Sequence, residues 1–291
     1  MNLDNERESE NVEDRRGESA GGGFSLSGGH LGIGGVVLAL VVSYFTGINP
    51  ATLLGLVSGG TPQSTSQSAP AHKPPANDEM AQFVSKVLAD TEDTWQQIFS
   101  ETNKSYRDPK LVLFSGATQT ACGPGKSAMG PFYCPLDEKV YIDLAFYQEL
   151  KDRFHAPGEF AEAYVIAHEV GHHVQNLLGI SDKMRAAQQR AGSEAQANAL
   201  SVRLELQADC FAGVWGNRAD SMRHIIEPGE IDQALNAATA IGDDRLQQQS
   251  QGTIRPETFT HGTSAQRVRW FKRGMASGQP AQCNTFSAQS L

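Results

Sequence analysis

The segment between residues 17 and 72 constrains this chain most, because Glu18 is its only Asp, Glu, Lys or Arg. Within this segment, residues 31–48 are almost wholly apolar. A run of about 20 apolar residues is long enough to cross a bilayer as a helix. Asn49-Pro50 would end such a helix, since proline disfavours helical backbone in the residue before it. We therefore predict one transmembrane helix over residues 30–57, rather than a buried core helix.

The apolar segment divides the rest of the chain into three parts. Residues 1–29 form an acidic tail, with seven acidic residues and three arginines. Residues 58–77 consist largely of Ser, Pro, Gln and other small or polar residues, which predicts a flexible linker. Residues 78–291 have the periodic apolar pattern of a folded domain.

Basic residues near the apolar segment predict its orientation. Arg15 and Arg16 precede it, and no lysine or arginine follows it before Lys73. Cytoplasmic flanks of a membrane helix carry the excess of basic residues. We therefore expect the N-terminus in the cytoplasm, the segment in the inner (cytoplasmic) membrane, and residues 78–291 in the periplasm or outside the cell. A cleaved signal peptide fits less well, because a polar stretch of about 30 residues precedes the apolar run.

The net charge of −9 excludes one class of partner. The tail contributes −4 of this charge, from seven acids and three arginines, so the remaining chain is only mildly acidic. Proteins that bind nucleic acid need a basic surface against the phosphates, and this sequence offers none. A hydrophobic content of 39% is typical of a globular protein with a packed core.

The first half of the domain predicts helices mixed with short strands. Asp78 is a candidate N-cap, and apolar residues follow at the helical period up to Phe99. Residues 110–116 and 139–142 read as strands, on either side of a glycine-rich loop over residues 122–134. We expect Asp143 to cap a helix that runs to about Phe154.

One helix carries the strongest functional motif, H-E-V-G-H. Apolar residues in the stretch from Phe160 to Leu178 recur as on an amphipathic helix. His168 and His172 are four residues apart, so both imidazoles lie on one face and can bind one metal ion. Glu169 is close enough to reach a water bound to that metal, whose pKa zinc lowers to about 7. We predict Glu169 as the general base.

A second helix offers the third ligand that a catalytic zinc site needs. Ser193-x-x-Gln196 predicts its N-terminus as a capping box. Glu205 and Asp209 are four residues apart on one side of it. Glu205 would bind the metal, and Asp209 would accept the free ring N–H of a ligand histidine. The alternative is that both acids belong to a solvated face.

These motifs resemble a known family. His168-Glu169-x-x-His172 followed by Glu205-x-x-x-Asp209 is similar to the gluzincin arrangement. The whole chain is more similar to the bacterial family of "putative neutral zinc metallopeptidases". The matching segments are residues 11–17 (NVEDRRG), 130–134 (GPFYC), 168–173 (HEVGHH), 205–209 (ELQAD) and 259–262 (FTHG). The resemblance implies an α+β fold, namely a mainly helical, zincin-like metallopeptidase domain with a small β-sheet, preceded by one transmembrane helix.

Two more histidines need an interpretation. His173 is five residues from His168 and points away from the metal face, so we expect it to pack rather than to bind metal. His261 precedes Gly262 and a capping-box pattern, Thr263-x-x-Gln266. Gluzincin-like enzymes place a histidine or tyrosine downstream of the third ligand as a donor to the transition-state oxyanion. The resemblance suggests His261 for this role, and a loop histidine without a catalytic role is the alternative.

Whether the four cysteines form disulfides depends on the compartment. Outside the cytoplasm, Cys122 and Cys134 would form a disulfide that closes a loop rich in glycine and proline. Cys210 and Cys283 would be the remaining pair, although Cys210 could also be a buried thiol in an apolar helix.

The function that follows is a membrane-anchored zinc peptidase, with Zn²⁺ as cofactor, a peptide or protein as substrate and the lipid bilayer as a partner. The alternative is a membrane-tethered binding or assembly factor with a structural or vestigial zinc site. A structural site would have four protein ligands, usually with cysteines, and no general base. Glu169 and the absence of cysteine near the histidines favour the enzyme.

Overall fold

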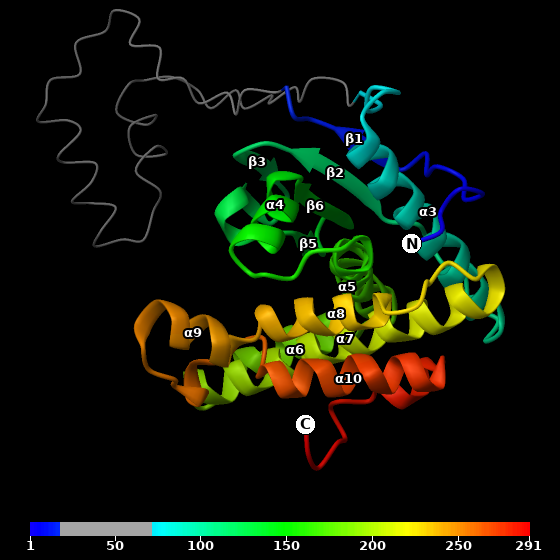
Figure 1. The fold of residues 1–291 in the computed structure, drawn as a ribbon. Coiled ribbons are helices and arrows are strands. Elements are labelled where there is room, and N and C mark those ends of the chain that lie inside the picture. Colours follow the sequence, from blue (N-terminus) through cyan, green and yellow to red (C-terminus); the bar gives the residue numbers. More distant parts are fainter. Residues whose placement is uncertain (18–71) are drawn as a thin grey trace, which may run out of the picture. The chain divides into compact units, whose positions relative to one another are not determined.

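A computed structural model describes residues 1–17 and 72–291 of the chain (Figure 1). These residues form one compact unit. The strands are β1 (Val12–Asp14), β2 (Lys110–Phe114), β3 (Ala117–Thr120), β4 (Gly123–Lys126), β5 (Phe132–Cys134) and β6 (Lys139–Asp143). The helices are α3 (Glu79–Ser100), α4 (Ala145–Asp152), α5 (Glu159–Leu177), α6 (Ile180–Gln189), α7 (Glu194–Arg223), α8 (Glu230–Ala240), α9 (Asp243–Gln251) and α10 (Ser264–Ser277). Three short 3₁₀ turns lie at Ser127–Met129, Pro256–Thr258 and Pro280–Cys283.

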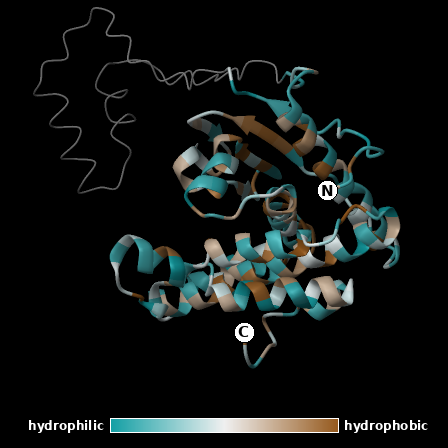
Figure 2. Cartoon of the chain, in the orientation of Figure 1, coloured by the Kyte–Doolittle hydropathy of each residue, from teal (hydrophilic) through white to brown (hydrophobic). Residues whose placement is uncertain are grey.

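A four-stranded sheet in the order β1-β2-β6-β5 forms one side of the unit. The first three strands are parallel, and β5 pairs antiparallel with β6 at one edge. β2 is apolar from Leu111 onward, as its colour in Figure 2 shows, and these four residues are buried. A run of this kind is typical of a strand that is covered on both faces. Strand β2 is therefore buried on both of its faces.

Helix α5 lies between the sheet and a layer of helices (Figure 1). It contacts β5 and β6 on one side, and α7 and α8 on the other. Its sequence explains this position, because most of its residues are buried and not only those of a single stripe. A helix in the middle of the core can present polar side chains to a protected interior.

Helices α7 and α10 pack unusually closely, and glycine makes this possible. A Cβ atom at Gly274 of α10 would lie 1.9 Å from the carbonyl oxygen of Cys210. A Cβ atom at Gly213 of α7 would lie 2.1 Å from the carbonyl oxygen of Phe271. Only residues without a side chain allow this backbone approach. The contact fixes α10 against the part of α7 that follows Glu205.

The N-terminal residues correct one prediction. Residues 1–29 were expected to form a separate tail, but residues 1–17 belong to the compact unit. Val12, Glu13 and Asp14 pair in parallel with Leu111, Val112 and Leu113. Three of the acidic residues that suggested a tail, Glu6, Glu13 and Asp14, are ion-paired. Glu13 contacts Arg15, Lys110 and Lys139. Burial raises the pKa of Glu13, but these three cations outweigh burial and hold it at about 2.

The same strand pairing rules out the predicted topology. A single membrane crossing between residues 17 and 72 would place β1 and β2 on opposite sides of the bilayer, where they could not share a sheet. Within residues 1–17 and 72–291, we find no helix with the length and apolar character needed to span a membrane. The predicted span over residues 30–57 and most of the predicted linker over residues 58–77 lie outside the described residues.

The fold of the described residues is α+β and mainly helical, as the sequence predicted, but it has two small sheets where one was expected. Three helix starts also agree with the sequence. Asp78 and Ser193 cap α3 and α7, and Thr263 forms a complete capping box with Gln266. The glycine-rich stretch over residues 122–134 differs from the expected loop, because it contains β4, which pairs with β3, and the edge strand β5. Asp143 ends β6, and Leu144 is the N-cap of α4.

Candidate metal centre

Helices α5 and α7 approach each other at the H-E-V-G-H motif. A Cβ atom at Gly171 would lie 3.0 Å from the carbonyl oxygen and 3.1 Å from the Cα atom of Ala208. Glycine at this position therefore lets the two helix backbones come within contact distance. His168 and His172 flank Gly171 on α5, and Glu205 lies one turn before Ala208 on α7. The helix crossing brings these three side chains together.

Their donor atoms have the arrangement of a metal site. The ligand atoms of His168, His172 and Glu205 all lie within 4.8 Å of one another. The Oε2 atom of Glu205 is 3.1 Å from Nε2 of His168 and 3.4 Å from Nε2 of His172. Two ligand atoms at zinc distance in a tetrahedral site lie about 3.4 Å apart. Two imidazoles and one carboxylate also match the ligand types of catalytic zinc, so these residues fit the ion.

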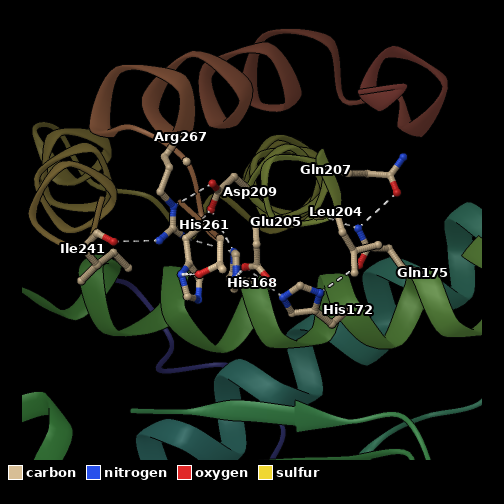
Figure 3. Close-up of polar contacts among 12 residues, drawn as sticks. His168, His172, Gln175, Leu204, Glu205, Gln207, Asp209, Ile241, His261 and Arg267 are labelled. Atoms are coloured by element: carbon tan, nitrogen blue, oxygen red, sulfur yellow. Dashed lines mark hydrogen bonds and ion pairs between the residues drawn. The ribbon is translucent and has the colours of Figure 1, made fainter. Parts of the chain in front are cut away.

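The Nδ1 atom of His168 is held by a buried polar cluster (Figure 3). It lies 2.9 Å from Oδ1 of Asp209, which also accepts hydrogen bonds from the Tyr164 hydroxyl and from Arg267. The Arg267 guanidinium binds both carboxylate oxygens of Asp209, each at 2.9 Å. This cluster orients the ring and leaves Nε2 of His168 to face Glu205.

Charge in this cluster is balanced only in part. Burial raises the pKa of Asp209, but Arg267 and His168 outweigh it and hold the pKa well below its usual range. Burial lowers the pKa of His168, but Asp209 and Glu205 raise it to about 10. The pKa of Glu205 is held low, against burial, by His172 and His168. The buried carboxylate of Asp209 and the partly buried carboxylate of Glu205 thus favour a positive charge at the imidazoles, and a divalent cation can supply that charge.

The Nδ1 atom of His172 has a different partner, the side-chain amide oxygen of Gln175 at 2.9 Å. Gln175 is fully buried. Both candidate ligand histidines therefore have Nδ1 engaged, and both turn Nε2 towards Glu205 (Figure 3).

Glu169 lies beside the ligands without being one of them. It is buried, and burial raises the pKa of its carboxyl above the usual value, partly offset by His168 and His172. A carboxylate with a raised pKa is better suited to accept and return a proton near neutral pH. Glu169 borders the same cleft as the three ligands.

A cleft of about 940 Å³ opens over this centre. It reaches the edge strand β5 on one side and helix α6 on the other. Its wall combines apolar side chains, such as Phe146, Phe154 and Met184, with polar groups such as Arg185. A cleft of this size that combines apolar side chains with convergent polar groups is typical of a ligand-binding site.

His261 also borders the cleft, and its side chain is half-exposed. Asp243, at the start of α9, fixes the loop that carries it. One oxygen of Asp243 accepts hydrogen bonds from the backbone N–H groups of Thr260, His261 and Gly262. The other lies 3.3 Å from Nδ1 of His261. Burial lowers the pKa of His261, but Asp243 and Glu205 outweigh it and raise the pKa above its usual value.

The predicted packing role of His173 agrees with its contacts. It is fully buried, with Nε2 2.6 Å from the carbonyl oxygen of Arg107 and Nδ1 3.0 Å from the hydroxyl of Tyr133. It thus joins α5 to β5 and lies outside the metal group.

Sequence reasoning missed four residues of this site, namely Tyr164, Gln175, Asp243 and Arg267. Tyr164 and Gln175 were detectable in principle, because they lie four residues before His168 and three after His172 on the same helix. Asp243 and Arg267 had no sequence signal, since their contacts depend on how α9 and α10 pack.

Both disulfides suggested by the sequence are present. Cys122 and Cys134 join the β4 hairpin to β5. Cys210 and Cys283 join α7 to the C-terminal 3₁₀ turn.

Comparison with known proteins gives four findings. A family model described as "Putative neutral zinc metallopeptidase" matches residues 1–286. The uncharacterized protein YpfJ of Escherichia coli is 56% identical over 291 residues, which cover 98% of this chain and 99% of that protein. An uncharacterized protein of Mycobacterium tuberculosis is 42% identical over 260 residues, which cover 83% of this chain and 86% of that protein. No solved structure matches.

Proposed function

Because the chain belongs to the "putative neutral zinc metallopeptidase" family, we propose that it is a zinc-dependent peptidase that hydrolyses peptide bonds. One observation carries this proposal. Three donor atoms, Nε2 of His168, Nε2 of His172 and Oε2 of Glu205, converge beneath an open cleft with Glu169 beside them. Three protein ligands leave a position for water, whereas a structural site uses four. The geometry therefore favours catalysis over a structural or vestigial zinc site.

The ion would supply a water of lowered pKa and polarise the substrate carbonyl. Glu169 accepts a proton from the attacking water and returns it to the leaving amine. His261, held by Asp243, donates a hydrogen bond to the oxygen on which negative charge develops. Asp209 and Gln175 keep the two ligand histidines in place and take no part in proton transfer.

The disulfides support a location outside the cytoplasm, because such bonds persist in oxidising compartments. Residues 1–17 and 72–291 then share that location, since β1 and β2 form one sheet. Contact of residues 30–57 with a bilayer stays a prediction from the sequence. The substrate class follows from the family, and the open cleft of about 940 Å³ gives a peptide access to the centre.

The test combines metal analysis with proteolysis by the purified full chain. We expect one zinc per chain and hydrolysis of an unfolded protein such as casein. Glu169→Gln should keep the zinc and lower kcat by 10²–10⁴-fold, because an amide cannot accept the proton of water (about the range of general-base effects). Glu149→Gln, a second acid at the same cleft, is the matched control and should keep wild-type kcat.

Two outcomes would contradict the proposal. A wild-type protein that holds zinc but cleaves no peptide would favour a binding role. Full activity of Glu169→Gln would assign the general base to another group.

A further inference from the structure

A series of hydrogen bonds between buried side-chain amides runs outward from His172. The Gln175 amide oxygen is 2.9 Å from Nδ1 of His172. The Gln175 amide nitrogen donates to the backbone carbonyl of Leu204 at 2.7 Å and to the amide oxygen of Gln207 at 3.1 Å. Gln207 then donates to the backbone carbonyl of Cys283 at 2.9 Å. Figure 3 shows the inner part of this series, from His172 to Gln207.

The donors and acceptors of this series of hydrogen bonds can be arranged in only one direction. A backbone carbonyl only accepts hydrogen bonds, so Gln207 must turn its NH₂ group towards Cys283 and its oxygen towards Gln175. Gln175 must then donate to Gln207 and to Leu204, and its own oxygen faces His172. That oxygen requires a proton on Nδ1 of His172. The lone pair of His172 is thereby left on Nε2, which faces Glu205.

The two carbonyls belong to elements that matter for the centre. Leu204 precedes the ligand Glu205 on α7, so Gln175 links one ligand side chain to the backbone beside another. Cys283 lies in the C-terminal 3₁₀ turn and is tied to α7 by its disulfide with Cys210. Gln175, Gln207 and Cys283 are all buried. Water therefore has little access to replace a broken bond of this series.

We propose that Gln175 and Gln207 are positioning residues that hold His172 in its metal-binding tautomer. The hydrogen bonds from Nδ1 of His172 through Gln175 and Gln207 form a relay, and the Cys283 carbonyl is its fixed outer end. The disulfide-bound C-terminal turn thus contributes to metal affinity, although it contains no ligand. The inference rests on the zinc centre proposed above. Partners that orient a ligand histidine typically contribute about 10–100-fold to metal affinity.

The experiment measures the zinc dissociation constant of the full chain by competition with a chelator. Gln175→Met should weaken zinc binding by about 10–100-fold, and Gln207→Met by about tenfold, the lower end of that range, because Gln207 acts only through Gln175. In the double variant, Gln207→Met should add nothing to the effect of Gln175→Met, since the link is already broken. Gln188→Met is the matched control. It removes an amide that joins α6 to Ser201 of α7 but contacts no ligand, and zinc affinity should be unchanged.

Thermal unfolding of the zinc-free proteins separates this role from a structural one. A structural role alone would lower the melting temperature of Gln207→Met and leave its zinc affinity at the wild-type value, which would overturn the relay. Additive losses in the double variant would also overturn it. If Gln175→Met does not fold, the comparison of Gln207→Met with Gln188→Met decides. A wild-type chain that binds no zinc would instead refute the proposed metal centre itself.

Discussion

At His261, one carboxylate performs two tasks. Asp243 binds three backbone N–H groups of the loop with one oxygen and faces the imidazole with the other. The first task fixes the position of His261 at the cleft. The second keeps its pKa above the usual value, so that the protonated ring, which is the stronger donor, persists to higher pH.

This arrangement predicts a pH dependence. If protonated His261 stabilises the oxyanion, kcat/KM should fall as the pH rises through the raised pKa of His261. Asp243→Asn can still accept the loop N–H groups but loses the negative charge, so the alkaline limb should move to lower pH. His261→Ala should remove this limb and lower kcat and kcat/KM together by about 10²–10³-fold at neutral pH. Both variants are tested by measuring the pH profile of peptide hydrolysis at constant zinc content.

Two results would contradict the predicted role of His261. An unchanged alkaline limb in Asp243→Asn would show that another group controls it. A rise in KM with normal kcat in His261→Ala would make His261 a substrate-binding residue.

At the scale of the elements, the crossing of α5 and α7 sets the distance between ligands on different helices. Gly171→Ala would place a methyl group 3.0 Å from the carbonyl oxygen of Ala208, which is tight enough that the two helix backbones must move apart by a few tenths of an ångström. We expect about tenfold weaker zinc binding, because Glu205 moves away from the histidines. The free energy of unfolding should change less than the free energy of zinc binding. Alanine has a higher helix propensity than glycine by about 1 kcal/mol, and this gain offsets part of the cost of overpacking.

Gly216→Ala on α7 is the control for this prediction. Its added methyl group would meet chiefly the flexible side chain of Met275, at 3.1 Å from the sulfur, which can move aside. Normal zinc affinity in Gly171→Ala would show that the helix spacing does not limit the metal centre.

Patterns within one element were predictable from the sequence, and contacts between elements were not. The helical period and the cap residues predicted α5 and α7, and the H-E-x-x-H and E-x-x-x-D spacings predicted which side chains meet on each helix face. The close approach at Gly171 and the pairing of Asp209 with Arg267 depend on residues about 40–60 positions apart. No local pattern encodes such contacts.

At the scale of the whole molecule, β1 is the largest departure from the prediction. A short acidic segment before an apolar run suggested a tail, because charge in the sequence does not reveal its partners. Arg7 pairs with Glu92 and Asp93 of α3, and Glu13 pairs with Lys110 and Lys139 of the sheet. Leu3 and Val12 are buried in the main core. The segment is therefore an integral strand and not an appendage.

This strand predicts a common location for the two flanks of the apolar segment. Glu8 and Lys272 are exposed, so cysteines introduced there can report on access from outside the cell. A membrane-impermeant maleimide should label Glu8→Cys and Lys272→Cys alike in intact cells with a permeable outer layer. Lysed cells provide the control for reactivity. Labelling of one position and protection of the other would mean that β1 and β2 are not paired in the cell.

The attachment of β1 has a consequence for a cut chain. The strand is held to the sheet by backbone hydrogen bonds, buried apolar side chains and ion pairs, none of which needs the covalent link through residues 18–71. A protease that cleaved this interval would therefore leave two fragments that remain associated. The N-terminal fragment would behave as a tightly bound peptide ligand of the catalytic fragment. The two fragments, made separately, would reassemble by strand complementation.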